Sequence, residues 1–376
     1  MLKETKKFLV AVSILIGTCI GAGVLGIPYV AAQSGFVVAL GYILLLGLII
    51  LFVNLYIGEI ALRTKGDHQL IGYAKKYLSK KWKHIMEFAV VFGIYAALVA
   101  YMFGMGESLS YLFIGTTNYG VYFGLGVGIL MAFLIKGGIR SLKKFEKYGV
   151  LIILLLLGVI FILFVGKIHL PNLTTFNPVF VFLPFGVILF SLMSFLAIPE
   201  VKLVLKGSQK LFKKVLITGT LISVIFYILF TLVILGYFGV NTPEIATLNL
   251  GTVFVFLGIF TMFTSYLASG NALIDNFKFD ERYNNRVSWF LAAIVPIAIF
   301  LIVETIDFFS FTTILSIGGV VAGGVMAMVV LLMIRKAKKK GNRIPEYSIP
   351  AKWWWIVLLS LIFILGVVRE LFLAFR

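Results

Sequence analysis

Four glycines and a proline interrupt the first long apolar run of the chain: Gly17, Gly21, Gly23, Gly26 and Pro28. Glycine weakens a helix and proline removes a backbone donor, so this run does not suit an uninterrupted membrane helix. In hydrocarbon a broken helix is tolerated only where it is buried in protein or lines a polar cavity. The stretch therefore predicts a binding site, with close helix packing through Gly17 and Gly21 as the alternative.

Two amides in this stretch are suited to an anion. A break near Gly21 leaves Ala22 and Gly23 at the start of the following half-helix. The free N–H groups and the positive dipole end at such a start favour a group such as a carboxylate. Because Gly23 has no side chain, the ligand can approach the backbone.

A second interrupted run lies at 190–199, where Ser191, Ser194 and Pro199 break an apolar sequence that Pro184 precedes. Farther along, Thr261, Thr264 and Ser265 place hydroxyl groups near the middle of another apolar run. With the carbonyls of Ile16 and Cys19, these hydroxyls could form a five-oxygen site for a small hard cation. The alternative is that the hydroxyls bond back to their own helix.

Coupling to protons would instead need a titratable group inside the membrane. Glu107 is the most deeply placed acid and is the candidate proton carrier, with a structural carboxylate as the alternative. All three histidines fall in or beside expected loops, and Cys19 is the one cysteine. No disulfide framework, cysteine metal site or histidine relay is therefore expected within the chain.

The composition shows which elements must position these residues. Hydrophobic residues make up 61% of the 376-residue chain, charged residues 13%, and the mean hydropathy is +1.09. These values predict an all-α integral membrane protein surrounded by a lipid bilayer. The net charge of +18 does not indicate a nucleic-acid partner, because the basic residues lie between the apolar runs.

The apolar runs are mostly long enough to cross a bilayer as helices. They predict eleven transmembrane helices, at 8–31, 36–62, 85–113, 119–136, 149–166, 179–203, 211–240, 250–276, 284–303, 310–334 and 351–373. With the N-terminus inside, 30 of the 33 Lys and Arg residues fall in inner segments and 3 in outer ones. This bias predicts a multi-pass plasma-membrane protein with a cytoplasmic N-terminus and an external C-terminus.

The first and sixth helices are both interrupted, and five spans apart they run in opposite directions. This pattern is typical of an inverted repeat whose broken helices form a site near the membrane midplane. We expect residues 1–166 (helices 1–5) to form the first half, residues 167–340 (helices 6–10) the second, and residues 341–376 an additional helix.

Four segments carry a resemblance to a known family: GTCIGAGVLGIPYVAAQSGF (17–36), YAALVAYMFGMGESL (95–109), FSLMSFLAIPEV (190–201) and FTSYLASGNALIDNF (263–277). They resemble the first, third, sixth and eighth helices of the amino acid/polyamine/organocation (APC) transporter superfamily. The likeness is closest to the hydroxy and aromatic amino acid permeases and the amino acid/auxin permeases. The resemblance implies the leucine-transporter-like five-plus-five inverted repeat, working by alternating access.

By this resemblance, the amides of Ala22 and Gly23 hold the carboxylate of an amino acid, and the carbonyls of 189–192 receive its ammonium group. Phe195 and Tyr101 match pocket or gate positions, with core packing as the alternative for each. The full set of expected substrate-binding residues is Thr18, Gly21, Ala22, Gly23, Tyr101, Leu189, Phe190, Ser191, Leu192, Ser194 and Phe195.

The sequence also departs from its relatives. Ala22 replaces the serine of many polyamine-type members, so the carboxylate would depend on backbone amides. Met193 and Leu196 make the second break more apolar, which favours an apolar or aromatic amino acid.

Two modes of coupling remain open. In sodium-coupled members of this fold, the positions matching Ile16, Cys19, Thr261, Thr264 and Ser265 hold the ion. Some proton-driven relatives instead place a lysine in helix 5, and 150–165 contains none. Sodium is slightly favoured, and proton symport or exchange is the alternative.

We expect a secondary transporter that imports an amino acid by cation symport. No cofactor is expected beyond a bound sodium ion. A membrane-embedded enzyme is disfavoured because neither HExxH nor paired aspartates at ligand spacing occur. An ion channel is disfavoured because the chain is expected to hold two inverted halves around one site.

Overall fold

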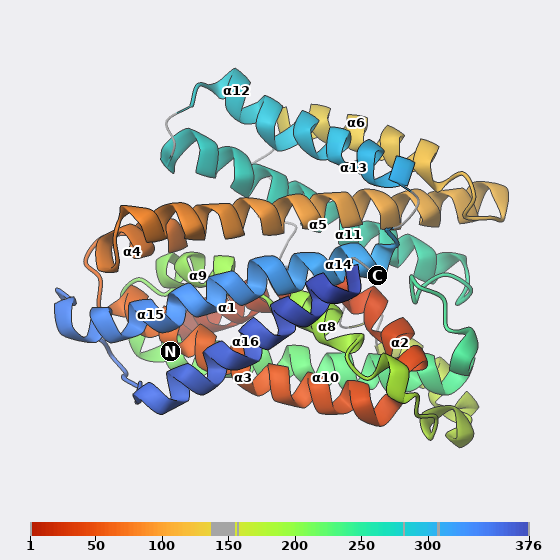
Figure 1. Cartoon of the computed structure of the whole chain (residues 1–376), viewed down its shortest axis with the longest axis horizontal. Helices are drawn as coiled ribbons and strands as arrows, with labels where there is room; N and C mark the ends of the chain where they lie inside the picture. Colours follow the sequence, from red (N-terminus) through yellow and green to blue (C-terminus); the bar gives the residue numbers. More distant parts are fainter. Residues whose placement is uncertain (1, 137–154, 156–157, 281–282, 307–308, 375–376) are drawn as a thin grey trace.

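The computed structural model describes residues 2–136, 155, 158–280, 283–306 and 309–374 (Figure 1). Its α-helices are α1 (Leu2–Cys19), α2 (Ala22–Ser34), α3 (Phe36–Leu62), α4 (Leu70–Tyr77), α5 (Lys80–Ile114), α6 (Gly120–Lys136), α8 (Pro184–Leu192), α9 (Ile198–Val204), α10 (Phe212–Phe238), α11 (Thr252–Asp275), α12 (Asn285–Trp289), α13 (Val295–Ile306), α14 (Phe311–Gly318), α15 (Gly324–Lys340) and α16 (Trp353–Ala374). Short 3₁₀ turns include Phe195–Ala197, and a π-helical turn at Gly319–Gly323 joins α14 to α15.

Within the described residues, eight helices are long and apolar enough to cross a membrane, or nine if the bent pair α1–α2 is one span. These helices make the chain a multi-pass membrane protein. Helix α6 and the helix at Gly158–Lys167 are apolar but shorter. Residues 149–154 and 156–157 of the span expected at 149–166 lie outside the described residues. The eleven-span count therefore remains a prediction.

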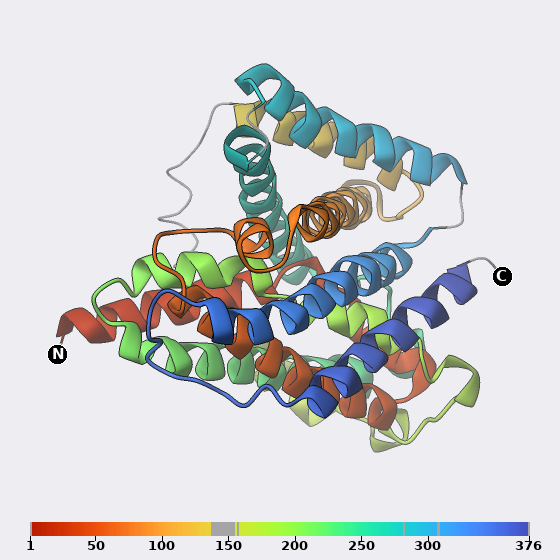
Figure 2. The same cartoon turned by 60° about the vertical axis from the view of Figure 1, so that its left-hand side comes forward.

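The helices form two layers, seen as the lower and upper parts of Figures 1 and 2. Helices α1, α2, α3, α8, α9 and α10 pack together in one layer, and α5, α6, α11 and α13 pack together in the other. Helices α14 and α15 contact both layers. In the view of Figure 2, the start of α1 and the end of α16 lie on opposite sides of the molecule.

The spans are helical because a backbone in lipid must satisfy its polar groups internally. Where the chain reverses, a special residue is needed. A single residue, Gly35, separates α2 from α3. Its φ of +107° is a backbone angle that residues with a side chain rarely adopt. This glycine is what allows two buried helices to meet in so short a turn.

Basic residues gather at one end of the bundle, which we call the basic end. There Lys7 donates to the carbonyl of Lys206 at 2.6 Å, and Lys202 donates to the carbonyl of Gly66 at 2.6 Å. The contacts tie the start of α1 to the segment after α9, so these two elements begin and end at the same level.

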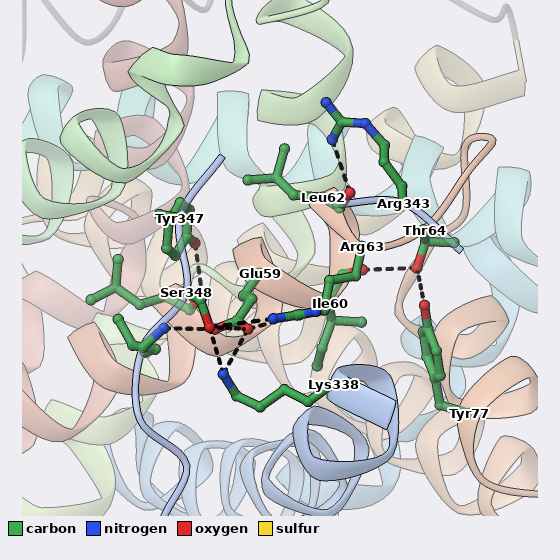
Figure 3. A network of polar contacts seen from close by, with 12 residues as sticks. Glu59, Ile60, Leu62, Arg63, Thr64, Tyr77, Lys338, Arg343, Tyr347 and Ser348 are labelled. Atoms are coloured by element: carbon green, nitrogen blue, oxygen red, sulfur yellow. Dashed lines mark hydrogen bonds and ion pairs between the residues drawn. The ribbon is translucent and has the colours of Figure 1, made fainter. Parts of the chain in front are cut away.

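A network centred on Glu59 fastens this end (Figure 3). The Glu59 side chain of α3 is fully buried and accepts hydrogen bonds from Arg63 at 2.8 Å and Lys338 of α15 at 2.8 Å. The hydroxyl of Ser348 at 2.9 Å and the amide of Ile349 at 2.9 Å complete its partners. Buried carboxylates need such compensation for the loss of water.

The same network holds the segment between α15 and α16 against α3. Arg343 donates to the carbonyl of Leu62 at 2.8 Å, and Tyr347 donates to that of Leu55 at 2.8 Å. Burial raises the pKa of the Tyr347 phenol, which keeps it protonated as a donor. The connection between α15 and α16 is thus built into the core rather than left as a free loop.

Candidate functional site

The first predicted break is present. Helix α1 ends at Cys19, helix α2 begins at Ala22, and the two axes differ by 51°. Between them, the amide of Ile20 still donates to the carbonyl of Ile16 at 2.8 Å, and that of Gly21 donates to the carbonyl of Cys19 at 3.1 Å. The glycine-rich sequence therefore bends the span where composition alone predicts.

The second predicted break is also present. Helix α8 ends at Leu192, and Met193 is extended, with φ of −66° and ψ of +107°. A 3₁₀ turn follows at Phe195–Ala197 before α9 begins. The proline at 199 lies in the first turn of α9, where its missing N–H is tolerated. Regular α-helical structure is therefore interrupted after Leu192, as it is after Cys19.

The two breaks lie against each other. A Cβ atom added to Gly23 would lie 2.9 Å from Cα of Ser191, and closer still to the Ser191 hydroxyl. The thiol of Cys19 is 3.8 Å from the carbonyl of Leu192. Gly23 therefore permits close contact between α2 and α8. The approach of a ligand to the Gly23 backbone remains a prediction.

Tyr227 of α10 joins both breaks. Its hydroxyl lies 2.7 Å from the carbonyl oxygen of Cys19 and 2.7 Å from that of Ser191. The side chain is fully buried. Sequence reasoning missed this residue, and the available signal was a tyrosine in the middle of the apolar run 212–238.

Gly21 brings the other layer to the break. A Cβ atom at Gly21 would lie 3.1 Å from the Tyr101 hydroxyl of α5 and 3.3 Å from the Ser265 hydroxyl of α11. The Tyr101 ring also neighbours Tyr266, with ring centroids 6.4 Å apart. Tyr101 and Ser265, two predicted residues outside the broken helices, thus lie beside the first break.

A buried amide supports the second break. Asn54 of α3 donates through Nδ2 to the hydroxyl of Ser194 at 2.9 Å and to that of Thr220 on α10 at 3.3 Å. Its Oδ1 has no hydrogen-bond partner within the described part of the chain. Asn54 was also missed, although an asparagine within the apolar sequence of 36–62 was a usable signal.

The candidate cation ligands keep local partners. The hydroxyl of Thr261 donates to the carbonyl of Gly258 at 2.8 Å, and that of Thr264 to the carbonyl of Phe260 at 3.1 Å. The Ile16 and Cys19 carbonyls accept the bonds described above. The Cys19 carbonyl already accepts from the Gly21 amide and the Tyr227 hydroxyl, so it must give up one of these bonds before it can bind a cation. The five-oxygen site remains a prediction.

Several predicted substrate residues pack against helices instead of facing one another. Leu189 and Phe190 contact the glycines around the π-helical turn, where a Cβ atom at Gly319 would lie 2.7 Å from the amide of Phe190. Phe195 is buried in the core. The glycines at 318, 319 and 323 therefore act as a close-packing surface for α8.

Two predicted residues lie apart from the break contacts. Thr18 is exposed, and its hydroxyl donates to the carbonyl of Ile14 at 2.8 Å. Glu107 lies at the contact of α5 with α6, where its Cγ would be 3.1 Å from a Cβ atom at Gly120. Its charged surroundings include Glu244 and Glu304. Glu244 itself accepts a bond from the amide of Thr312 at the start of α14.

An apolar cavity of about 20 Å³ adjoins the first break, lined by Ile20 and by residues of α2, α10 and α11 that include Val24 and Thr261. This volume has room for little more than one water molecule. An amino acid could enter here only after the helices move.

Comparison with known proteins gives a family. The model of the tryptophan/tyrosine permease family matches residues 4–248, more than half of the chain. The chain belongs to this family. These permeases are transporters and not enzymes.

A curated relative of this permease is the tyrosine-specific transport system 1 of Haemophilus influenzae. The two are 28% identical over 248 residues, which cover 62% of this chain and 60% of the relative. The permease therefore spans less than two thirds of that relative's length. The family match includes both breaks, Tyr101 and Tyr227, and it ends before α11.

Proposed function

We propose that this permease is a secondary transporter of an aromatic amino acid, either tyrosine or tryptophan. The observation that carries the proposal is the meeting of two broken helices at Gly23 and Ser191 in a chain of this family. One break offers amides at Ala22 and Gly23 to a carboxylate, and the other offers carbonyls at 189–192 to an ammonium group. An amino acid carries these two charges one carbon apart.

We further propose the APC five-plus-five arrangement for the fold, with eleven spans and the division at residues 166 and 340. The antiparallel placement of the breaks supports it: α1 begins at the basic end, and α9 finishes there through the contact of Lys7 with Lys206. The positive charge of this end supports a cytoplasmic N-terminus in the plasma membrane.

Transport would proceed by alternating access with a cation entering alongside the substrate. Because the cavity at the first break measures only about 20 Å³, binding must separate the two layers before the site can close around its ligand. Sodium at the Thr261, Thr264 and Ser265 hydroxyls is the favoured coupling ion. Proton coupling through Glu107 is the second candidate, supported by its half-buried position.

The test is uptake of labelled L-tyrosine and L-tryptophan into proteoliposomes that contain the full chain. A sodium gradient and a proton gradient are imposed separately, with empty liposomes as the control. We expect accumulation of at least one of the two amino acids under one gradient. If neither is accumulated or exchanged under either gradient, the proposed function is wrong, and ionic currents far above transporter turnover would favour a channel.

A further inference from the structure

Tyr227 lies between the two broken helices at the middle of α10. Its ring packs against Phe226 with centroids 6.2 Å apart, and the side chain is fully buried. Its oxygen is 2.7 Å from each of two carbonyl oxygens, those of Cys19 and Ser191. A phenol has one hydrogen, so a single donor serves both acceptors.

Both acceptors belong to the ends of helices. Cys19 is the last residue of α1, and Ser191 precedes the last residue of α8. The last carbonyls of a helix have no partner within the helix and carry the negative end of its dipole. When such carbonyls are buried without a donor, the folded state is destabilised. The Cys19 carbonyl also accepts from the Gly21 amide at 3.1 Å, so the Ser191 carbonyl is the one that most needs a hydrogen or a positive charge beside it at every stage.

These carbonyls are also the ones at which the proposed function places positive ligands. Ser191 belongs to the segment expected to receive the ammonium group, and Cys19 to the set expected to hold the cation. We infer that the Tyr227 hydroxyl fills this position in the unloaded carrier and that the substrate ammonium group displaces it. The inference rests on the proposed function, because only a carrier needs the position to be filled in two alternative ways.

The exchange satisfies the carbonyls in both states. An ammonium group has three N–H donors and a full charge, so it serves two carbonyls better than one shared phenol hydrogen does. In the unloaded state, which a symporter must pass through in each cycle, the phenol prevents the helix ends from being left unpaired. Tyr227 therefore stabilises the unloaded form and competes with the substrate, which makes it a positioning residue that weakens binding.

The test compares the parent with Tyr227→Phe, which keeps the ring and removes only the hydroxyl. Equilibrium binding of labelled L-tyrosine and L-tryptophan is measured on the purified full chain. We expect the Kd to fall about tenfold, the change that one ordinary hydrogen bond gives. The unfolding midpoint should fall for the unloaded variant and match the parent at saturating amino acid, because ligand stabilises the loaded state.

The matched control is Tyr73→Phe. Tyr73 of α4 is also fully buried, and its hydroxyl has no hydrogen-bond partner among the described residues. We expect both measurements to remain at the parent value in this variant.

Two outcomes would overturn the inference while the proposed function stands. One is a Kd for Tyr227→Phe that is equal to or higher than that of the parent. The other is an unfolding midpoint that falls equally without ligand and at saturating amino acid, as the loss of a merely structural hydrogen bond would give. If the parent binds neither amino acid, the proposed function fails, and the role of Tyr227 fails with it.

Discussion

The bundle contains two buried polar regions that are built in opposite ways. At the basic end, the Glu59 carboxylate meets Arg63 and Lys338, and both of its oxygens have donors. At the two breaks, the polar groups are neutral and several are incompletely paired: one phenol hydrogen serves two carbonyls, and Oδ1 of Asn54 has no partner among the described residues.

This difference follows from what each region must do. A fully paired buried charge is strongly destabilising to break, so it suits a joint that holds α3, α15 and the segment before α16 together. Neutral groups with spare hydrogen-bonding capacity can exchange partners at little cost, as a ligand site requires. The comparison predicts that substitutions at the basic end change stability, whereas substitutions at the breaks change binding.

The largest effect is expected from Glu59→Ala. Removing the carboxylate leaves two cations and the amide of Ile349 without their acceptor, which should lower the free energy of unfolding by about 3 kcal/mol. Denaturant unfolding of the purified protein measures this loss. Glu346→Ala, which breaks the more exposed pair with Arg343, should cost about 1 kcal/mol or less. Equal losses in the two variants would contradict the assignment of Glu59 as the joint.

Gly23→Val is expected to have the next largest effect, on binding. The added side chain would meet Ser191 and separate the breaks, with a cost of about 1–3 kcal/mol that corresponds to roughly 5- to 150-fold weaker tyrosine binding. Gly126→Val is the matched control, because a Cβ atom there meets nothing within 4 Å. Unchanged affinity in Gly23→Val would remove Gly23 from the proposed site.

Asn54→Leu should have a smaller effect, both on the free energy of unfolding and on tyrosine binding. The leucine would leave the hydroxyls of Ser194 and Thr220 without their shared partner, at a cost of about 1–2 kcal/mol. We expect a few-fold change in tyrosine affinity, measured alongside unfolding. Thr231→Val is the control, since its buried hydroxyl has no partner among the described residues. A wild-type affinity in Asn54→Leu would make Asn54 a purely structural residue.

Composition was enough to predict the two breaks because both depend on local chemistry. Glycine and proline weaken a helix wherever they occur, and the observed ends at Cys19 and Leu192 fall within the predicted stretches. Tyr227 and Asn54 could not be assigned in this way. Their roles depend on which helix neighbours the breaks, and a hydropathy pattern contains no information about packing partners.

The π-helical turn at Gly319–Gly323 shows the same limit. Its Gly319 lies against Phe190 and its Gly323 against Met193 and Leu189 of the neighbouring segment, and a hydropathy pattern does not indicate such contacts. Local sequence therefore predicted where helices bend by themselves, and it missed what neighbouring helices impose.

The smallest change in stability is expected at the candidate cation site, where neutral oxygens alone would bind a charged ion. If neutral oxygens hold sodium, the parent should gain about 1.4 kcal/mol of stability at a sodium concentration ten times the Kd, relative to potassium. Thr264→Ala combined with Ser265→Ala should remove this gain without changing the stability in potassium by more than about 1 kcal/mol. Thermal unfolding in the two salts measures both.

A parent protein that sodium does not stabilise would exclude sodium as the coupling ion and leave the carboxylate of Glu107 to carry the coupling. In that case Glu107→Gln, which keeps the size of the side chain but cannot titrate, should abolish proton-driven accumulation and preserve exchange of amino acid across the membrane. Retained accumulation in this variant would show that the coupling ion is bound neither by the neutral oxygens nor by Glu107. A neutral site can discriminate between cations only by size and oxygen geometry, whereas a carboxylate responds to pH, so the two tests separate the alternatives.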